Sequence, residues 1–379
     1  MEIPAPGELA LYDSRSQELK NQLKVATAWD RPLRVVQWNL ERGYKLQQEL
    51  DYLQTLDADI VCLQEVDIDN ERSGNVNQAK IIAERLGLNG GFVTEFIEIR
   101  DPCRSAAQQG GGVHGNTIYS KFDMKFRVVK HEHQPYDWNS DGRFLREPRL
   151  GERYTIAAEV DIPGRSPLLV YSAHFECFCG ISGRVGQLAD LIKDSRAMAE
   201  KFPHQLVFGD FNTIGHSLAR LSPIFCTDRY RWGSLGMSEP EWWYHHILSW
   251  YASDGPKNLL LQHQPLPHGV SSTDDWLLKN TVNPEWWDPF DVRKDVTISN
   301  HLGWMQAKAD WTFVRQMVVL KHWMGNEDYA MSDHKCLNLY VDFATPEQDE
   351  IHKCINKRIA TELEQRRQIE KSRRKTVFA

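Results

Sequence analysis

The feature that most constrains this 379-residue chain is a series of short apolar runs, each of which ends in polar residues. The first run, residues 33–40 (LRVVQWNL), has the length and composition of a buried strand. Residues 45–57 follow with leucines spaced three and four apart, which predicts an amphipathic helix, and residues 58–66 (ADIVCLQEV) return to strand. This alternation predicts an α/β protein.

The same pattern recurs further along the chain. Further strands are predicted at 92–99, 113–120, 154–162, 167–175, 205–209, 310–316 and 336–342, and a helix is predicted at about 183–201. Apolar strands buried between layers, with helices outside, favour two packed sheets over one open sheet.

Changes of composition divide the chain into three parts. Residues 1–30 are predicted to be an N-terminal extension, and residues 31–345 hold all the predicted strands, interrupted by an insertion at about 220–308 that has little periodicity. Residues 346–379 are predicted to be a basic, charged C-terminal helix or tail. From residue 353 to residue 375, nine Lys or Arg against three Glu give a net charge of +6, which leaves −13 on the rest of the chain.

The insertion is rich in tryptophan, because nine of the 13 tryptophans lie between residues 232 and 311. Rings at this density are expected mainly to pack against the core, since each buries a large apolar area. The alternative is that some of them line a cleft and stack on a substrate. We expect core packing for most of them and one or two at the rim of the site.

The composition excludes several classes of protein. A net charge of −7 argues against a wholly basic protein that coats nucleic acid. No apolar stretch reaches the length of a membrane span, and no signal peptide is recognisable at the N-terminus. Seven scattered cysteines fit reduced thiols. The expectation is an intracellular protein, cytoplasmic or nuclear, with no evident obligate protein partner.

Short polar sequence motifs, which we call polar words, follow several of the predicted strands. They are Trp38-Asn39, Gln64-Glu65, His174, residues 209–212 (GDFN) and residues 332–334 (SDH). Each word alone is typical of a turn or a helix cap. Because all of them follow buried strands, their carboxylates are expected to converge, and such a cluster requires a cation or hydrogen-bond donors among them.

This ordered set, WN, QE, HGN, H, GDFN, DW and SDH, resembles the endonuclease/exonuclease/phosphatase superfamily, the fold of deoxyribonuclease I, over residues 33–343. The resemblance implies a four-layer αββα sandwich of two mostly antiparallel sheets flanked by helices. It also implies metal-dependent hydrolysis of phosphate esters by in-line attack of an activated water.

The resemblance also implies a metal site. Glu65 resembles the carboxylate that binds the metal directly, and Asp333 would contact the ion directly or through water. Asn39 would position the metal or the phosphate, and Glu41 would complete the shell of ligands. Oxygen ligands of this kind suit Mg²⁺ or Mn²⁺.

The remaining matches are to catalytic residues. Asp210 resembles the residue that orients or deprotonates the attacking water, and Asn212 the amide that holds a phosphate oxygen and the nucleophile. His334 resembles the histidine that faces the phosphate, and Asp310 the carboxylate that orients it and raises its pKa. His174 resembles a second histidine near the leaving oxygen.

Three further residues are candidates for substrate binding. Asn116 and His114 lie in a glycine-rich lead into a strand, where Asn116 would donate to the phosphate and His114 would face the cleft. Arg184 follows the His174 strand and would hold a phosphate bidentately, although a solvated helix face is an equal alternative.

The sequence leaves the substrate open, because one fold serves many substrates. A nuclease that hydrolyses phosphodiester bonds is the first hypothesis, and nucleic acid is then the substrate. The second is a phosphatase or phosphodiesterase that acts on a small molecule or a lipid headgroup. The third is an inactive scaffold member of the family, which the complete set of acidic residues and histidines disfavours.

Overall fold

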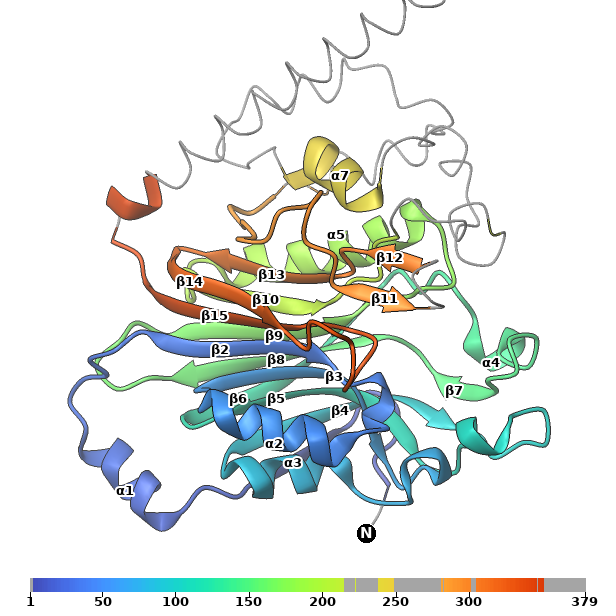
Figure 1. Ribbon diagram of the computed structural model, residues 1–379. Helices are drawn as coiled ribbons and strands as arrows, with labels where there is room; N and C mark the ends of the chain where they lie inside the picture. Colours follow the sequence, from blue (N-terminus) through green and yellow to red (C-terminus); the bar gives the residue numbers. More distant parts are fainter. Residues whose placement is uncertain are drawn as a thin grey trace, which may run out of the picture.

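Two packed sheets form the centre of the molecule (Figure 1). The computed structural model describes residues 3–214, 222, 238–248, 281, 283–300, 305–345 and 347–350. The larger sheet has the strand order β1 (Leu9–Asp13), β4 (Asn89–Glu98), β5 (Val113–Ser120), β3 (Ile60–Ile68), β2 (Leu33–Asn39), β15 (Cys336–Phe343) and β14 (Met317–Gly325), and β7 (Arg149–Gly151) pairs with β4. The smaller sheet has the order β13 (Asp310–Arg315), β10 (His204–Asp210), β9 (Leu168–His174), β8 (Tyr154–Asp161) and β6 (Asp123–Lys130).

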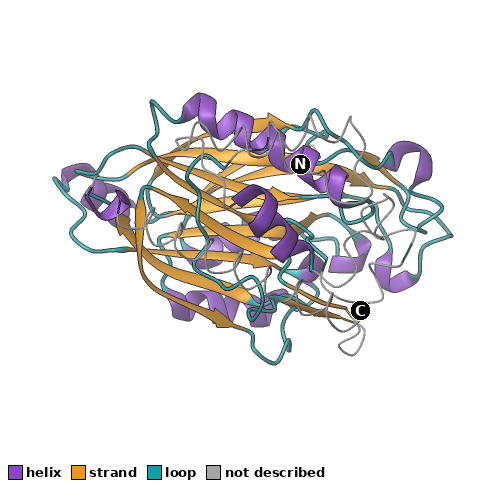
Figure 2. Ribbon diagram, turned by 90° about the horizontal axis from the view of Figure 1, so that it is seen from above, coloured by secondary structure: helices purple, strands orange, loops and turns teal. Residues whose placement is uncertain are grey.

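Helices cover the outer faces of both sheets. Helices α2 (Leu46–Leu56) and α3 (Gln78–Leu86) pack on the larger sheet, and α5 (Ile181–Met198) and α7 (Glu239–Trp243) pack on the smaller one (Figure 1). Figure 1 and Figure 2 both show that the strands run along the long direction of the described part of the molecule. The αββα sandwich with four layers is therefore confirmed.

Apolar side chains fill the spaces between the layers. Between the two sheets, Val35 and Ile60 from one sheet pack with Val170 and Leu206 from the other, and each is at most 1% exposed. At about 25 cal/mol per Å² of apolar surface removed from water, this inner layer is a principal source of stability.

Both sheets contain a parallel pair of strands that brings polar residues to one edge. Strands β2 and β3 are parallel and pair Asn39 with Gln64, and β9 and β10 are parallel and pair Asp210 with His174. A side chain on Gly209 would lie 2.0 Å from the carbonyl oxygen of Ala173, so glycine allows the close approach of β9 and β10. The polar strand ends therefore meet where the two sheets face each other.

The structure extends the predicted set of elements. The sequence analysis missed the outer strands β1, β6 and β14, helix α3, and helix α1 (Gln17–Val25). Strand β1 lies inside the segment that we described as an N-terminal extension, and it pairs with β4. Two short strands, β11 (Ile298–Asn300) and β12 (Met305–Ala307), lie at the end of the insertion.

The described tryptophans of the insertion pack against the smaller sheet. Trp242, Trp243 and Trp286 are each at most 3% exposed, and they join the core cluster beneath α5. Trp243 stacks on Trp311, with ring centroids 5.9 Å apart. Most of the insertion, including Trp232, Trp250, Trp276 and Trp304, and residues 351–379 of the basic tail lie outside the described residues. Within the described part of the chain, no helix is long and apolar enough to cross a bilayer.

We predict that Glu49→Gln changes the pH dependence of stability. Glu49 on α2 is fully buried, and its carboxylate oxygens have no hydrogen-bond partner among the described residues. Burial, reinforced by Glu41, raises the pKa of Glu49 to about 9. Unfolding therefore releases a proton between about pH 5 and pH 9, and stability falls as pH rises through this window.

Relative to the wild type, Glu49→Gln should therefore increase the free energy of unfolding more at pH 8 than at pH 5. The difference between the two proteins should grow by on the order of 1 kcal/mol per pH unit. Urea unfolding at several pH values measures this difference. Glu18→Gln, at an exposed glutamate of α1, is the matched control. An equal effect of Glu49→Gln at both pH values would contradict the prediction.

Candidate active site

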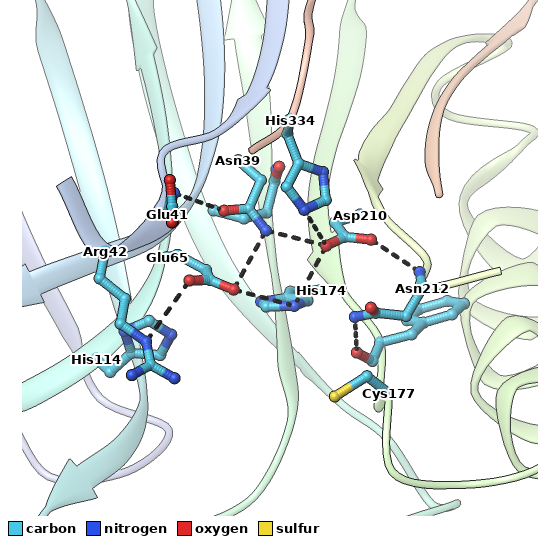
Figure 3. Close-up of polar contacts among 12 residues, drawn as sticks. Asn39, Glu41, Arg42, Glu65, His114, His174, Cys177, Asp210, Asn212 and His334 are labelled. Carbon is cyan, nitrogen blue, oxygen red and sulfur yellow. Dashed lines mark hydrogen bonds and ion pairs between the residues drawn. The ribbon is translucent and has the colours of Figure 1, made fainter. Parts of the chain in front are cut away.

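The polar strand ends line a cavity of about 270 Å³, which we call the site cavity. Eight of the residues singled out in the sequence contribute to its walls, and they come from both sheets. These residues are Glu41, Glu65, His114, His174, Asp210, Asn212, Asp333 and His334. The predicted convergence of the polar words is therefore visible in the structure (Figure 3).

Glu65 lies at an irregularity of strand β3. The register with β5 shifts between Leu63 and Val66, and Glu65 has a φ of 59°, which is uncommon for a residue other than glycine. The bulge turns its carboxylate into the site cavity, where the Asn39 amide donates to it at 3.3 Å and Arg42 Nε lies 3.8 Å away. Backbone strain of this kind is typical of functional positions.

Three carboxylates face one another on one side of the site cavity. Burial raises the pKa of Glu41, and repulsion from Asp333 and Glu65 adds to the increase. Burial likewise raises the pKa of Asp333, whereas Arg42 and nearby histidines outweigh burial and lower the pKa of Glu65. The backbone N–H of Asp333 donates to Glu41 Oε2 at 3.1 Å, which links two of the three. Their mutual repulsion and their oxygen donors fit a divalent cation such as Mg²⁺ or Mn²⁺.

Asp210 occupies the centre of the hydrogen-bond network. Its Oδ2 accepts a hydrogen bond from Asn39 at 2.9 Å, and its Oδ1 accepts one from the backbone N–H of Asn212 at 2.8 Å. Burial raises the pKa of Asp210 to about 6, although His334 opposes this increase. Asn212, with a φ of 51°, donates its side-chain amide to the carbonyl oxygen of Phe175 at 2.9 Å. The carboxylate is thus held in place and suited to accept a proton near neutral pH.

His334 is held by a chain of buried hydrogen bonds. Its Nδ1 lies 2.8 Å from Asp310 Oδ2, and Gln37 donates to the other oxygen of Asp310 at 3.0 Å. Burial alone would lower the pKa of His334, but the carboxylates of Asp310 and Asp210 outweigh burial and keep that pKa well above its ordinary value. Its Nε2 lies 3.6 Å from Asp210 Oδ2. These neighbours therefore favour the charged form of the imidazole beside Asp210.

His174 lies between Glu65 and Asp210 (Figure 3). Its Nε2 is 4.0 Å from Glu65 Oε1 and 3.6 Å from Asp210 Oδ2. Burial, reinforced by the positive charge of Arg153, lowers the pKa of His174 well below its ordinary value. The pKa values of two histidines in the same site are thus shifted in opposite directions, because a carboxylate is hydrogen-bonded to His334 whereas His174 lies near arginines.

The four other sequence candidates occupy different places. Asn39 and Asp310 support the lining residues from behind, through the hydrogen bonds just described. Asn116 is fully buried and donates to the carbonyl oxygen of Tyr154. Arg184, also fully buried, does not reach the site cavity, because both Nε and Nη2 are bonded to Glu239, at 2.8 and 2.7 Å. Arg184 thus joins α5 to the insertion.

Sequence reasoning missed one wall of the site cavity. Arg42, Arg149 and Arg153 line it together with Trp138 and Glu147. Arg42 donates twice to Glu147, at 2.9 and 3.0 Å, and Arg149 pairs with the same glutamate. Nothing in the spacing of these residues marked them, because they come from the short helices η1 (Glu41–Gly43) and α4 (Trp138–Asp141), from the short strand β7 and from loops. The one signal in the sequence was Arg42 itself, three residues beyond Asn39.

Comparisons with known proteins agree with this geometry. A family model described as "Endonuclease/Exonuclease/phosphatase family" matches residues 36–334. No curated protein matches the sequence significantly.

Several solved structures share the fold. ANGEL2, a 2′,3′-cyclic phosphatase, has a TM-score of 0.50 at 14% identity, covering 84% of this chain and 98% of its own. An endonuclease/exonuclease/phosphatase from Beutenbergia cavernae DSM 12333 has a TM-score of 0.48 at 16% identity, covering 83% of this chain and 72% of its own. The 3′ phosphatase NExo from Neisseria, bound to a product DNA hairpin, has a TM-score of 0.47 at 17% identity, covering 82% of this chain and all of its own.

The family model spans all the polar words from Trp38 to His334, and these words meet in the site cavity. The chain therefore belongs to the endonuclease/exonuclease/phosphatase family, a family of phosphoester hydrolases.

Proposed function

We propose that this protein is a divalent-metal-dependent hydrolase that cleaves phosphodiester bonds by in-line attack of water. One observation carries the proposal: Asp210 lies 3.6 Å from both His334, whose pKa is raised, and His174, whose pKa is lowered, and Glu65 faces the same cavity. Groups with pKa values shifted in opposite directions at one point are typical of acid–base sites.

The metal would be held by Glu65, with Glu41, Asp333 and Asn39 as further donors. When bound, Mg²⁺ or Mn²⁺ neutralises charge on the phosphate and orients it. We propose either Mg²⁺ or Mn²⁺ as the bound ion, because a set of oxygen donors accommodates both.

The chain's own residues carry out the proton transfer and the charge stabilisation. Asp210 takes the proton of the attacking water, and its hydrogen bonds to Asn39 and Asn212 direct its carboxylate. His334 in its protonated form stabilises charge that develops on the non-bridging oxygens, and Asp310 keeps it oriented. His174, as a neutral imidazole, offers a hydrogen bond to the leaving oxygen. His114 contacts the substrate from the cavity wall.

A nucleic-acid strand is the first substrate that we propose, and residues 31–345 are the proposed catalytic domain. The structure of ANGEL2, a 2′,3′-cyclic phosphatase, has been solved in complex with adenosine-2′,3′-vanadate. A compact phosphate ester is the second candidate, because the site cavity holds about 270 Å³ and its arginines are paired with glutamates rather than left for a phosphate backbone.

Removal of divalent metal should abolish hydrolysis. We expect a generic phosphodiester such as bis-p-nitrophenyl phosphate to be cleaved with Mg²⁺ or Mn²⁺ and not after treatment with a chelator, since three carboxylates then repel one another without a counter-charge. Release of p-nitrophenol measures the rate. Equal rates with and without metal, or none across DNA, RNA and small esters, would contradict the proposed function.

Asp210→Asn and His334→Gln should each lower kcat by roughly 10²- to 10⁴-fold, because each removes a proton acceptor or a charge at the reaction centre. The fold should remain, as circular dichroism and thermal melting can show. Asp161→Asn, at an exposed residue at the opposite end of the smaller sheet, and His322→Gln, at an exposed histidine of β14, are matched controls. Active-site variants that retain full activity would exclude these roles.

The two substrate classes differ in their dependence on salt. For a nuclease that binds several phosphates, kcat/KM for a labelled oligonucleotide should fall steeply between low and moderate salt, because bound counterions are released on binding. Hydrolysis of a dinucleotide by the same protein serves as the internal control. A fall limited to the oligonucleotide supports the nuclease, and equal, weak salt dependence of both substrates supports the compact ester.

A further inference from the structure

One buried ion pair ties the insertion to two loops of the site cavity. These loops follow β9 (residues 175–180) and β10 (residues 211–214), and we call them the β9 loop and the β10 loop. The side chains of Arg184 on α5 and Glu239 on α7 are 0% and 1% exposed, and the guanidinium donates through Nε and Nη2 to both carboxylate oxygens. A bidentate pair of this kind fixes the orientation of both partners. The mechanism proposed above uses neither residue.

Arg184 holds the β9 loop through its third guanidinium nitrogen. Nη1 donates to the carbonyl oxygen of Cys179 at 3.1 Å and to that of Cys177 at 3.4 Å. Cys177 and Phe178 line the site cavity, so the loop that the guanidinium holds is part of the cavity wall. A guanidinium is suited to this task because its planar fork donates in several fixed directions at once.

Glu239 holds the β10 loop, which begins directly after Asp210. Its Oε2 accepts a hydrogen bond from the backbone N–H of Ile214 at 3.1 Å, and its own backbone N–H donates to the carbonyl oxygen of Ile214 at 3.0 Å. Asn212 donates its backbone N–H to Asp210 and its side-chain amide to the carbonyl oxygen of Phe175. The β10 loop is therefore fixed at both ends, with Asn212 between them.

Aromatic packing connects α7 to the same strand ends. The ring centroid of Trp243 on α7 lies 6.2 Å from that of Phe211 and 5.9 Å from that of Trp311. Phe211 in turn stacks on Phe175, with centroids 4.3 Å apart. Each of these three partners directly follows a candidate site residue, at the ends of β9 and β10 and at the start of β13. Because close-packed interiors transmit displacements, a shift of α7 would reach the strand ends that carry the site.

We propose that Arg184 and Glu239 are positioning residues, through which the insertion places Asn212 and the cavity wall. Through Asn212 the pair also directs the carboxylate of Asp210. This role rests on the function proposed above, because it concerns the same site. Misplacement of a catalytic group by about 1 Å can slow a reaction by about 100-fold. Loss of the pair should therefore lower kcat more than it raises KM.

The kinetics of Glu239→Gln and Arg184→Lys test this role. For bis-p-nitrophenyl phosphate we expect kcat to fall by about 10- to 100-fold and KM to change by roughly threefold at most, because neither variant keeps the bidentate pair. Asp194→Asn is the matched control, since Asp194 also lies on α5 but pairs with Arg127 of β6, at the outer edge of the smaller sheet. It should keep the wild-type kcat.

Thermal melting shows whether each variant is folded under the assay conditions. A lower melting temperature with a wild-type kcat in both Glu239→Gln and Arg184→Lys would reduce the pair to a structural role and overturn the proposal. Failure of both variants to fold would assign the pair to the stability of the whole domain and would overturn it as well.

Hydrogen exchange followed by mass spectrometry gives a readout that needs no substrate. In folded Glu239→Gln or Arg184→Lys, backbone amides of the β9 and β10 loops should exchange about tenfold faster than in wild type, because local opening becomes easier. Amides of β8 should keep the wild-type rate. Unchanged exchange in both loops contradicts the positioning role. If the wild type hydrolyses no phosphate ester, the proposed function fails, and exchange still decides whether the pair holds the two loops.

Discussion

The structure depends on one electrostatic constraint, which is the meeting of several carboxylates at the edge where two sheets face each other. Asp210 and Asp310 are almost fully buried, and Glu41, Glu65 and Asp333 are partly so. Removal of like charges from water is costly unless each finds a counter-charge or a donor. Asn39 and His334 supply part of that compensation, and a divalent cation completes it in the function that we propose.

The same constraint explains why two histidines a few ångströms apart have opposite protonation tendencies. Asp310 is hydrogen-bonded to His334 and stabilises its charged form, whereas the field of Arg153, added to burial, favours the neutral form of His174. Each outcome follows from neighbours that come from distant parts of the chain. Burial alone would have lowered both pKa values.

Local patterns were sufficient for the inner strands and for most of the site. Strands such as β2, β3 and β10 are apolar on both faces and stand out as continuous runs, and the polar word after each marks the strand end. The outer strands β6 and β14 were missed because few of their residues are buried, so neither forms a long continuous apolar run. Arg184 shows the other limit, since its position after a strand suggested a phosphate ligand and its partner, Glu239, lies 55 residues away.

By itself the sequence determined the α/β sandwich, the family resemblance and the identity of eight of the residues that line the site cavity, because apolar runs and strand periodicity are local properties. Only the tertiary structure decided how those residues are paired and charged. The pairing of Arg42 with Glu147, the Asp67–His114 pair and the unsatisfied nitrogen of His174 each depend on contacts between neighbouring strands, between the two sheets or between the segments that connect the strands. Such contacts join residues far apart in the chain, and no local pattern records them.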